Sequence, residues 1–333
     1  MLVLALGKTS VGNEKVQVTN DQSRRLFNMA YIFGPVPSRR LGLSLGVDLI
    51  PAKTCTYDCL YCQVGRTTQK TVQTNPFVPI HTVLDELKKR LEIFTPDAIT
   101  LSGSGEPTLY SEIDKIITSI KAITGTKIAI LTNGSLFWQE EVRRRVSGAD
   151  IIMPTLTTAF EETFRTIHRS HPELSVKSII EGLGRLRQMY KGQIFLEVFL
   201  LAGINDSENE LEGLKEVIDL ICPDKIQLNT VVRPPADQSA ISLDMERLKE
   251  IRDFFGERAE IIAEAPLRGG WGQHDSMVES ILEMAKRRPL RALDIATLFN
   301  MPLEEAEGVI KGLEIKGTLR QQEHLGEVYY MRG

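Results

Sequence analysis

The chain has 333 residues, of which 42% are hydrophobic and 25% are charged, and its formal net charge is −4. This composition is typical of a globular protein with a sizeable core, and the length favours one large domain plus a small one. The weak negative charge excludes a global attraction to nucleic acid or anionic membranes, and no apolar run is long enough to span a bilayer. We expect a cytoplasmic protein.

Residues 1–28 are polar after the first few positions and show no sustained period. We predict a loose, disordered extension there, and the apolar pattern that begins at Met29 makes this methionine a candidate start of translation. From about residue 45, short apolar runs alternate with longer amphipathic ones. The runs that predict strands are residues 45–50, 98–102, 127–132, 150–154, 193–201, 225–232 and 260–264.

Helical periodicity occupies the stretches between these strands. Residues 79–94 place Val83, Leu87 and Leu91 on one face, and residues 113–120 and 176–186 show the same pattern. Alternating strands and helices predict an α/β fold around a parallel sheet, either open or closed into a barrel. In such sheets, functional residues gather at the carboxyl ends of the strands.

A glycine-rich stretch at residues 266–276 predicts a linker after a main domain of residues 29–265. Beyond it, helical patterns cover residues 277–286, 292–299 and 303–316, and residues 319–331 have hairpin character. Three short helices and a hairpin fit a winged-helix-like domain over residues 277–333. Its third helix holds four acidic residues and two lysines, which disfavours DNA binding and favours contact with a protein or peptide.

Three of the four cysteines, Cys55, Cys59 and Cys62, form a C-x3-C-x2-C motif directly after the first predicted strand. A disulfide scaffold would instead spread an even set of cysteines over a short secreted chain. Thiolates suit iron–sulfur clusters, and three local ligands leave one iron of a four-iron cluster open, as in catalytic centres. The alternatives are a zinc site completed by a histidine, with His81 nearest in sequence, and three cysteines that pack as small hydrophobes.

The cysteine motif, with Tyr61 before its last cysteine, resembles the signature of the radical S-adenosylmethionine (SAM) superfamily. Residues 102–108, Ser-Gly-Ser-Gly-Glu-Pro-Thr, resemble that superfamily's Gly-Gly-Glu turn after the second strand. Residues 131–134, Leu-Thr-Asn-Gly, are similar to its third strand end. The resemblance covers residues 31–265 and implies a partial parallel (β/α)6-type barrel.

By this resemblance, the three cysteines hold a [4Fe–4S] cluster whose free iron binds SAM, and reductive cleavage yields a 5′-deoxyadenosyl radical that modifies the substrate. The resemblance implies further cofactor-binding residues, namely Tyr61, Ser104, Gly105, Glu106, Asn133, Thr155 and Glu197. The Glu106 carboxylate would meet the methionyl ammonium of SAM, and Tyr61 would stack on adenine or pack in the core. No side chain is assigned a catalytic role, because the cofactor carries the hard chemistry. A flavodoxin- or ferredoxin-type protein would supply the electron.

Several polar residues have two interpretations. Glu197 lies in an apolar strand, so it either serves SAM or substrate or forms a structural ion pair. Arg39 and Arg40 either bind the SAM carboxylate or a substrate phosphate, or form a solvated surface pair. His168 and His171 have no carboxylate pattern nearby and receive no catalytic role.

Within the superfamily, residues 34–40, 198–206 and 227–235 resemble uncharacterised proteins grouped with tRNA wyosine-base (4-demethylwyosine) synthetases, which rebuild a guanine in tRNA. Those tRNA enzymes carry extra amino-terminal cysteines for a second cluster, which this sequence lacks, and Thr157 stands where the superfamily often has an acidic residue.

The resemblance implies modification of tRNA or a nucleoside. The alternatives are modification of a peptide delivered to the winged-helix-like domain, and a non-catalytic iron–sulfur or zinc regulator that binds DNA. Because the cysteine motif, the glycine-rich turn and Asn133 all precede residue 140, we expect deletion of residues 277–333 to preserve SAM cleavage.

Overall fold

The computed structural model describes residues 31–263 and 277–333. The predicted extension at residues 1–28, the candidate start at Met29 and the predicted linker at residues 266–276 therefore lie outside the described residues.

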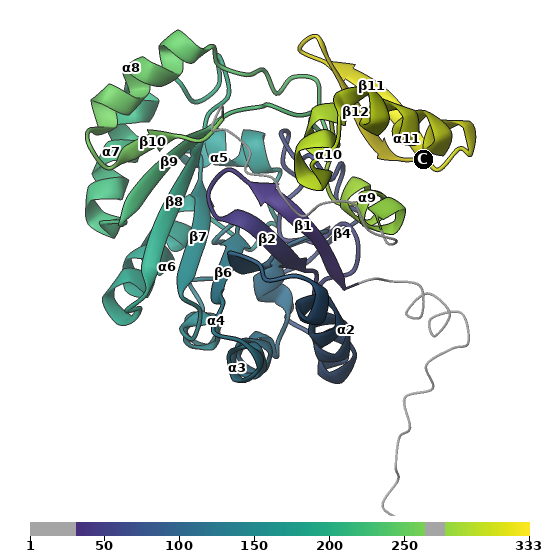
Figure 1. Ribbon diagram of the computed structural model, residues 1–333. Helices are drawn as coiled ribbons and strands as arrows, with labels where there is room; N and C mark the ends of the chain where they lie inside the picture. The colour runs from purple at the N-terminus through teal and green to yellow at the C-terminus, as the bar shows by residue number, and fades with distance from the viewer. Residues whose placement is uncertain (1–30, 264–276) are drawn as a thin grey trace, which may run out of the picture. The chain divides into compact units, whose positions relative to one another are not determined.

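An eight-stranded open sheet is the centre of the fold (Figure 1). In spatial order its strands are β1 (Ile32–Ser38), β2 (Gly42–Val47), β5 (Ala98–Leu101), β6 (Lys127–Thr132), β7 (Ile151–Leu156), β8 (Gln193–Phe199), β9 (Lys225–Asn229) and β10 (Ala259–Ile261). All pairs from β2 to β10 are parallel, as the alternating sequence pattern predicts, and the edge strand β1 pairs antiparallel with β2. The pairing leaves β1 and β10 as edges, so the described sheet does not close into a barrel.

Helices connect the parallel strands, as right-handed crossover units require. They are α2 (Ile80–Ile93), α3 (Ile113–Ile123), α4 (Glu140–Val146), α5 (Glu161–His168), α6 (Val176–Met189), α7 (Glu208–Ile221) and α8 (Met245–Phe255). A short 3-10 helix, η1 (Pro107–Leu109), follows β5, and β3 (Thr54–Cys55) pairs with β4 (Gln69–Lys70) outside the main sheet.

The two faces of the sheet bury different side chains, because successive residues of a strand point to opposite faces. On β8, Ile194 and Leu196 belong to the large core that the helices cover. Phe195 lies in a smaller cluster on the opposite face, and Glu197, two residues further along β8, points to that same face. The alternation therefore places the Glu197 carboxylate on the face away from the helices.

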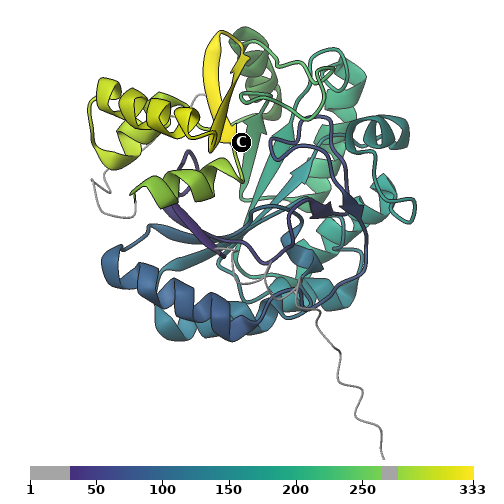
Figure 2. The ribbon, with the colours of Figure 1, turned by 90° about the vertical axis from the view of Figure 1, so that its right-hand side faces the viewer.

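Three helices and a hairpin follow in the predicted order, coloured yellow-green in Figures 1 and 2. They are α9 (Met277–Ala285), α10 (Ala292–Phe299), α11 (Leu303–Ile315), β11 (Leu319–His324) and β12 (Glu327–Arg332). Leu298, Phe299 and Ile310 are central to a hydrophobic cluster of their own. Val36 of β1 and Leu43 of β2 pack against that cluster, so this segment covers the antiparallel edge of the sheet.

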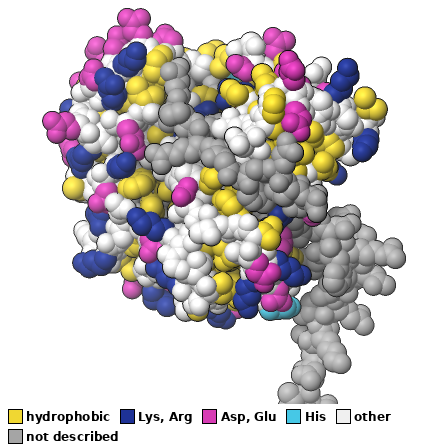
Figure 3. Space-filling view, in the orientation of Figure 1, with side chains coloured by type: hydrophobic (Ala, Val, Ile, Leu, Met, Phe, Trp, Pro, Cys, Tyr) yellow, Lys and Arg dark blue, Asp and Glu magenta, His cyan; other side chains and the backbone are white. Residues whose placement is uncertain are grey.

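Basic and acidic side chains intermix over the face shown in Figure 3, in keeping with the small net charge. Within the described ranges, no helix combines the length and hydrophobicity that a membrane crossing needs.

Candidate active site

A cavity of about 410 Å³ gathers residues from the carboxyl ends of several strands. Its wall includes Cys55, Cys59, Tyr61 and Cys62 from the loop after β2, Ser102–Gly105 after β5, Leu131 of β6, Glu197 and Phe199 of β8, and Asn229 of β9. Three of the sequence motifs, which lie far apart along the chain, therefore meet in one place. This is the edge where a parallel sheet of this class carries its ligands.

The cysteine loop is pinned to α5 by its backbone. Asp58 N donates to His168 O at 2.8 Å, and Leu60 N donates to Ile167 O at 2.9 Å. The Tyr57 side chain beneath the loop is 2% exposed, which fixes the loop against the core. The loop therefore presents its sulfurs to the cavity from a rigid base.

The three thiols form a donor set that needs a positive partner. Burial raises the pKa of Cys55 to about 12. Burial, and then the facing sulfurs of Cys55 and Cys62, raise the pKa of Cys59 well above its ordinary value. Three soft donors that repel one another as thiolates fit a [4Fe–4S] cluster, which neutralises them and needs no fourth local cysteine. In the part of the chain that the structure describes, no three His, Cys, Asp or Glu side chains form a group suited to a metal ion by themselves.

His168 contacts the cysteine loop, which the sequence did not reveal. Its Nδ1 lies 3.1 Å from Cys59 Sγ, and its Nε2 lies 2.8 Å from Thr157 Oγ1. Burial lowers the pKa of His168 to about 3, so the ring is neutral and one nitrogen donates while the other accepts. Thr157, the residue that departs from the superfamily pattern, is thus the partner that orients this histidine.

The glycine-rich turn lies against the cysteine loop through its backbone. Lys53 N donates to Ser104 O at 2.8 Å, and Glu106 N donates to Thr54 O at 3.2 Å. A Cβ on Gly105 would lie 2.0 Å from Thr54 O, so only glycine permits this approach. The turn and the cysteine loop therefore form one unit.

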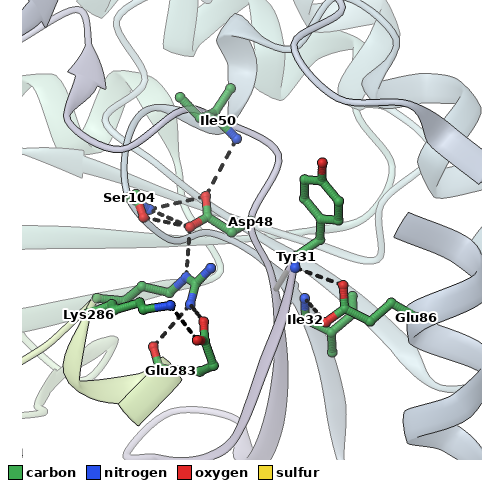
Figure 4. A network of polar contacts seen from close by, with 9 residues as sticks. Tyr31, Ile32, Asp48, Ile50, Glu86, Ser104, Glu283 and Lys286 are labelled. Atoms are coloured by element: carbon green, nitrogen blue, oxygen red, sulfur yellow. Dashed lines mark hydrogen bonds and ion pairs between the residues drawn. The ribbon is translucent and has the colours of Figure 1, made fainter. Parts of the chain in front are cut away.

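An acidic residue outside all the motifs holds the turn in place. Asp48 is 4% exposed and accepts hydrogen bonds from Ser104 N at 3.2 Å and Ser104 Oγ at 2.6 Å (Figure 4). Arg287, just after α9, lies 2.7 Å from the same carboxylate through its Nε. The sequence signal that could have identified Asp48 as a functional residue is its position as a charged residue within the apolar run Val-Asp-Leu-Ile.

Glu106 points into the chain rather than lining the cavity. Its carboxylate accepts from Thr108 N and Oγ1, from Thr132 Oγ1 at 2.6 Å and from Asn133 N at 2.8 Å. Burial raises the pKa of Glu106, and these hydrogen bonds oppose that rise. The geometry gives Glu106 the role of joining the ends of β5 and β6, and its predicted contact with the SAM ammonium stays a prediction.

Asn133 is held beside the cysteine loop. Its Nδ2 lies 2.7 Å from Thr56 Oγ1 and 3.6 Å from Cys55 Sγ. Amide donors near a cluster sulfur tune its reduction potential.

Glu197 is the centre of a second polar group. It accepts from Arg40 Nη1 at 3.1 Å, Thr155 Oγ1 at 2.7 Å and Asn229 Nδ2 at 3.0 Å. The structural ion pair is therefore present, and it lies on the cavity wall. Asn229 Oδ1 is buried and has no hydrogen-bond partner among the described residues, which leaves an acceptor for a ligand.

The structure changes the interpretation of two features, the Arg39–Arg40 pair and Tyr61. Arg39 and Arg40 both line the cavity, so a solvated surface pair is the wrong interpretation. The Tyr61 ring stacks on Phe199, with ring centroids 3.9 Å apart. Phe199 is thus a further aromatic residue on the wall, and Tyr61 packs as well as facing the cavity.

Known proteins resemble this chain in sequence and in fold. A UPF0026 protein of Methanocaldococcus jannaschii is 32% identical over 91% of this chain and 96% of its own length. A protein named GTPase Obg of Brachyspira hyodysenteriae is 33% identical over 93% of this chain, which spans 46% of that relative. A solved structure of TYW1 with a lysine-pyruvate adduct bound has a TM-score of 0.50 at 18% identity, covering 65% of this chain and 74% of that one.

The Radical SAM superfamily profile matches residues 49–215, which include the cysteine loop, the glycine-rich turn, Thr155 and Glu197. Members of this superfamily are enzymes that use a [4Fe–4S] cluster and SAM. The chain belongs to the radical SAM superfamily.

Proposed function

We propose that Cys55, Cys59 and Cys62 ligate the cluster of this radical SAM enzyme, and that the enzyme modifies a nucleoside or tRNA. One observation carries the proposal: the three thiols, the Ser102–Gly105 turn and Glu197 share a single cavity. The cluster and SAM, when bound, supply a 5′-deoxyadenosyl radical that takes a hydrogen atom from the substrate.

The chain's own residues bind SAM and orient it. The Ser102–Gly105 backbone offers polar groups to the amino-acid part of SAM, and the Glu197 carboxylate, held by Arg40 and Asn229, offers acceptors to its ribose. Tyr61 and Phe199 give the wall an apolar surface that excludes water. The cavity is built from strand ends, so these groups are held before SAM binds.

The nucleoside or tRNA substrate is supported by the sequence resemblance to proteins grouped with wyosine-base synthetases. The family assignment decides against the non-catalytic regulator. We further propose a flavodoxin- or ferredoxin-type electron donor, a partial (β/α)6-type barrel over residues 29–265 and a winged-helix-like domain over residues 277–333.

A peptide substrate is the second candidate, and one observation favours it. The carboxy-terminal segment exposes Leu293, Ile315 and Leu325 by 53–80%. Exposed apolar side chains on a small segment suit contact with a peptide.

Anaerobic reconstitution tests the proposal. We expect a brown protein with about four iron atoms per chain that converts SAM to 5′-deoxyadenosine under dithionite. A reconstituted protein that binds zinc in preference to iron, or that leaves SAM intact, would contradict it. The substrate class is tested by comparing modified nucleosides between a deletion strain and the wild type: a missing nucleoside supports tRNA, and an unchanged profile favours the peptide.

Replacing Gly105 with alanine is expected to lower kcat/KM for SAM cleavage by on the order of 100-fold, the effect of a displacement near 1 Å. The added Cβ, 2.0 Å from Thr54 O, must push the turn away from the cysteine loop. The matched control is Gly184→Ala in α6, where a Cβ meets nothing within 4 Å. Equal rates for the two variants would show that the turn does not position SAM.

A further inference from the structure

Three arginines from distant parts of the chain share one wall of the cavity. Arg39 follows β1, Arg233 follows β9, and Arg288 follows α9, and all three line it. Arg39 Nη1 lies 3.5 Å from Ile262 O, and Arg233 Nε donates to Pro289 O at 3.2 Å. These contacts to neutral carbonyls hold the Arg39 and Arg233 guanidinium groups in place without supplying a negative charge.

The nearest carboxylate is already occupied. Asp294, which is 2% exposed, pairs with Arg291 at 3.1 Å and approaches Arg288 only to 4.0 Å. Within the described ranges, neither Arg39 nor Arg233 has a carboxylate at ion-pair distance, and Nε and Nη2 of Arg288 are buried without a hydrogen-bond partner. The wall therefore holds three positive charges with weak compensation.

Such a group is costly to bury without an anion. Burial, and then the neighbouring Arg233, lower the pKa of Arg39 to about 10 and that of Arg288 to about 9. The Asp294 carboxylate raises both pKa values, but burial and the neighbouring arginines outweigh it, so one carboxylate does not offset the positive charge of this wall.

We propose that Arg39, Arg233 and Arg288 bind a phosphate group of the substrate. Guanidinium groups match phosphate oxygens with two parallel hydrogen bonds each. A phosphate carries up to two negative charges and three acceptor oxygens, which suits three donors better than one carboxylate does. The inference rests on the proposed function and deepens it: the substrate is a phosphorylated nucleoside, free or within RNA.

The test is equilibrium binding of inorganic phosphate to the cluster-loaded full chain, saturated with SAM, by isothermal titration calorimetry. We expect saturable binding at one site per chain, weakened at least about tenfold in Arg288→Gln and in Arg39→Gln, because each loses charge-assisted hydrogen bonds. The matched control is Arg252→Gln, whose side chain pairs with Asp253 on the surface and should bind phosphate like the wild type. The two variants lie on different segments, so poor folding of one leaves the other as the test.

Competition assigns the source of the phosphate. Displacement of phosphate by guanosine 5′-monophosphate but not by guanosine indicates a free nucleotide, and displacement by an RNA oligonucleotide alone indicates a nucleic acid; either supports the site. Absence of saturable phosphate binding, wild-type affinity in both variants, or competition with SAM overturns it, the last because the arginines would then hold the SAM carboxylate. Binding needs no turnover, so a protein that binds phosphate but leaves SAM intact would fail the proposed function alone.

Discussion

Cys59→Ala is expected to lower the iron content from about four atoms per chain to background and to abolish 5′-deoxyadenosine formation. Cys55, Cys59 and Cys62 all line the cavity, and no fourth cysteine among the described residues does. No further cysteine of the cavity wall can therefore replace Cys59 as a cluster ligand. Iron analysis and the ultraviolet–visible spectrum after anaerobic reconstitution give the measurement.

The fold of this variant should persist. Cys59 lies on a loop at the end of the sheet and is only partly buried, so losing its sulfur should cost about 1 kcal/mol of unfolding free energy. Cys222→Ala is the matched control, because that cysteine is exposed and lies far from the cavity in sequence. Full iron loading in Cys59→Ala, or equal loss in Cys222→Ala, would refute the ligand assignment.

The parallel part of the fold was predictable because its signal is local. Each buried strand is a short apolar run between amphipathic helices, and the run at Lys127–Thr132 coincides with β6. Strand β1 was missed because Pro35 and Pro37 interrupt it, and proline argues against a strand except at an edge. The structure places β1 at that edge.

The residues of the site also divide into those that a local sequence pattern reveals and those that it does not. The three cysteines and the Ser102–Gly105 turn are contiguous motifs that sequence can reveal. The contact of His168 with Cys59 joins residues 109 positions apart, and that of Arg287 with Asp48 spans 239 positions. Such pairs depend on tertiary packing, which no local period encodes.

Arg287→Met is expected to weaken SAM binding at least about tenfold, which equals about 1.4 kcal/mol of binding free energy. Asp48 would lose the guanidinium that lies 2.7 Å away, and it holds both the backbone and the hydroxyl of Ser104 (Figure 4). A nearly buried carboxylate without its partner costs about 3–5 kcal/mol, so it would turn toward water and release the turn. Equilibrium SAM binding to the cluster-loaded protein gives the measurement.

This contact revises the expectation that residues 277–333 can be deleted without loss of SAM cleavage, because Arg287 belongs to that segment. The deletion should reproduce the SAM-binding defect of Arg287→Met, and Arg287→Lys should restore part of the affinity by returning the charge.

Lys286→Met is the control that separates positioning from stability. Lys286, like Arg287, forms an ion pair with Glu283, but its ion pairs among the described residues do not include Asp48. It should therefore lower thermal stability slightly and leave SAM affinity unchanged. If Arg287→Met lowered the melting temperature while SAM bound at wild-type strength, the arginine would only stabilise the fold. In that case the glycine-rich turn would keep its position without the carboxy-terminal segment, and the truncated protein would cleave SAM as the sequence alone predicts.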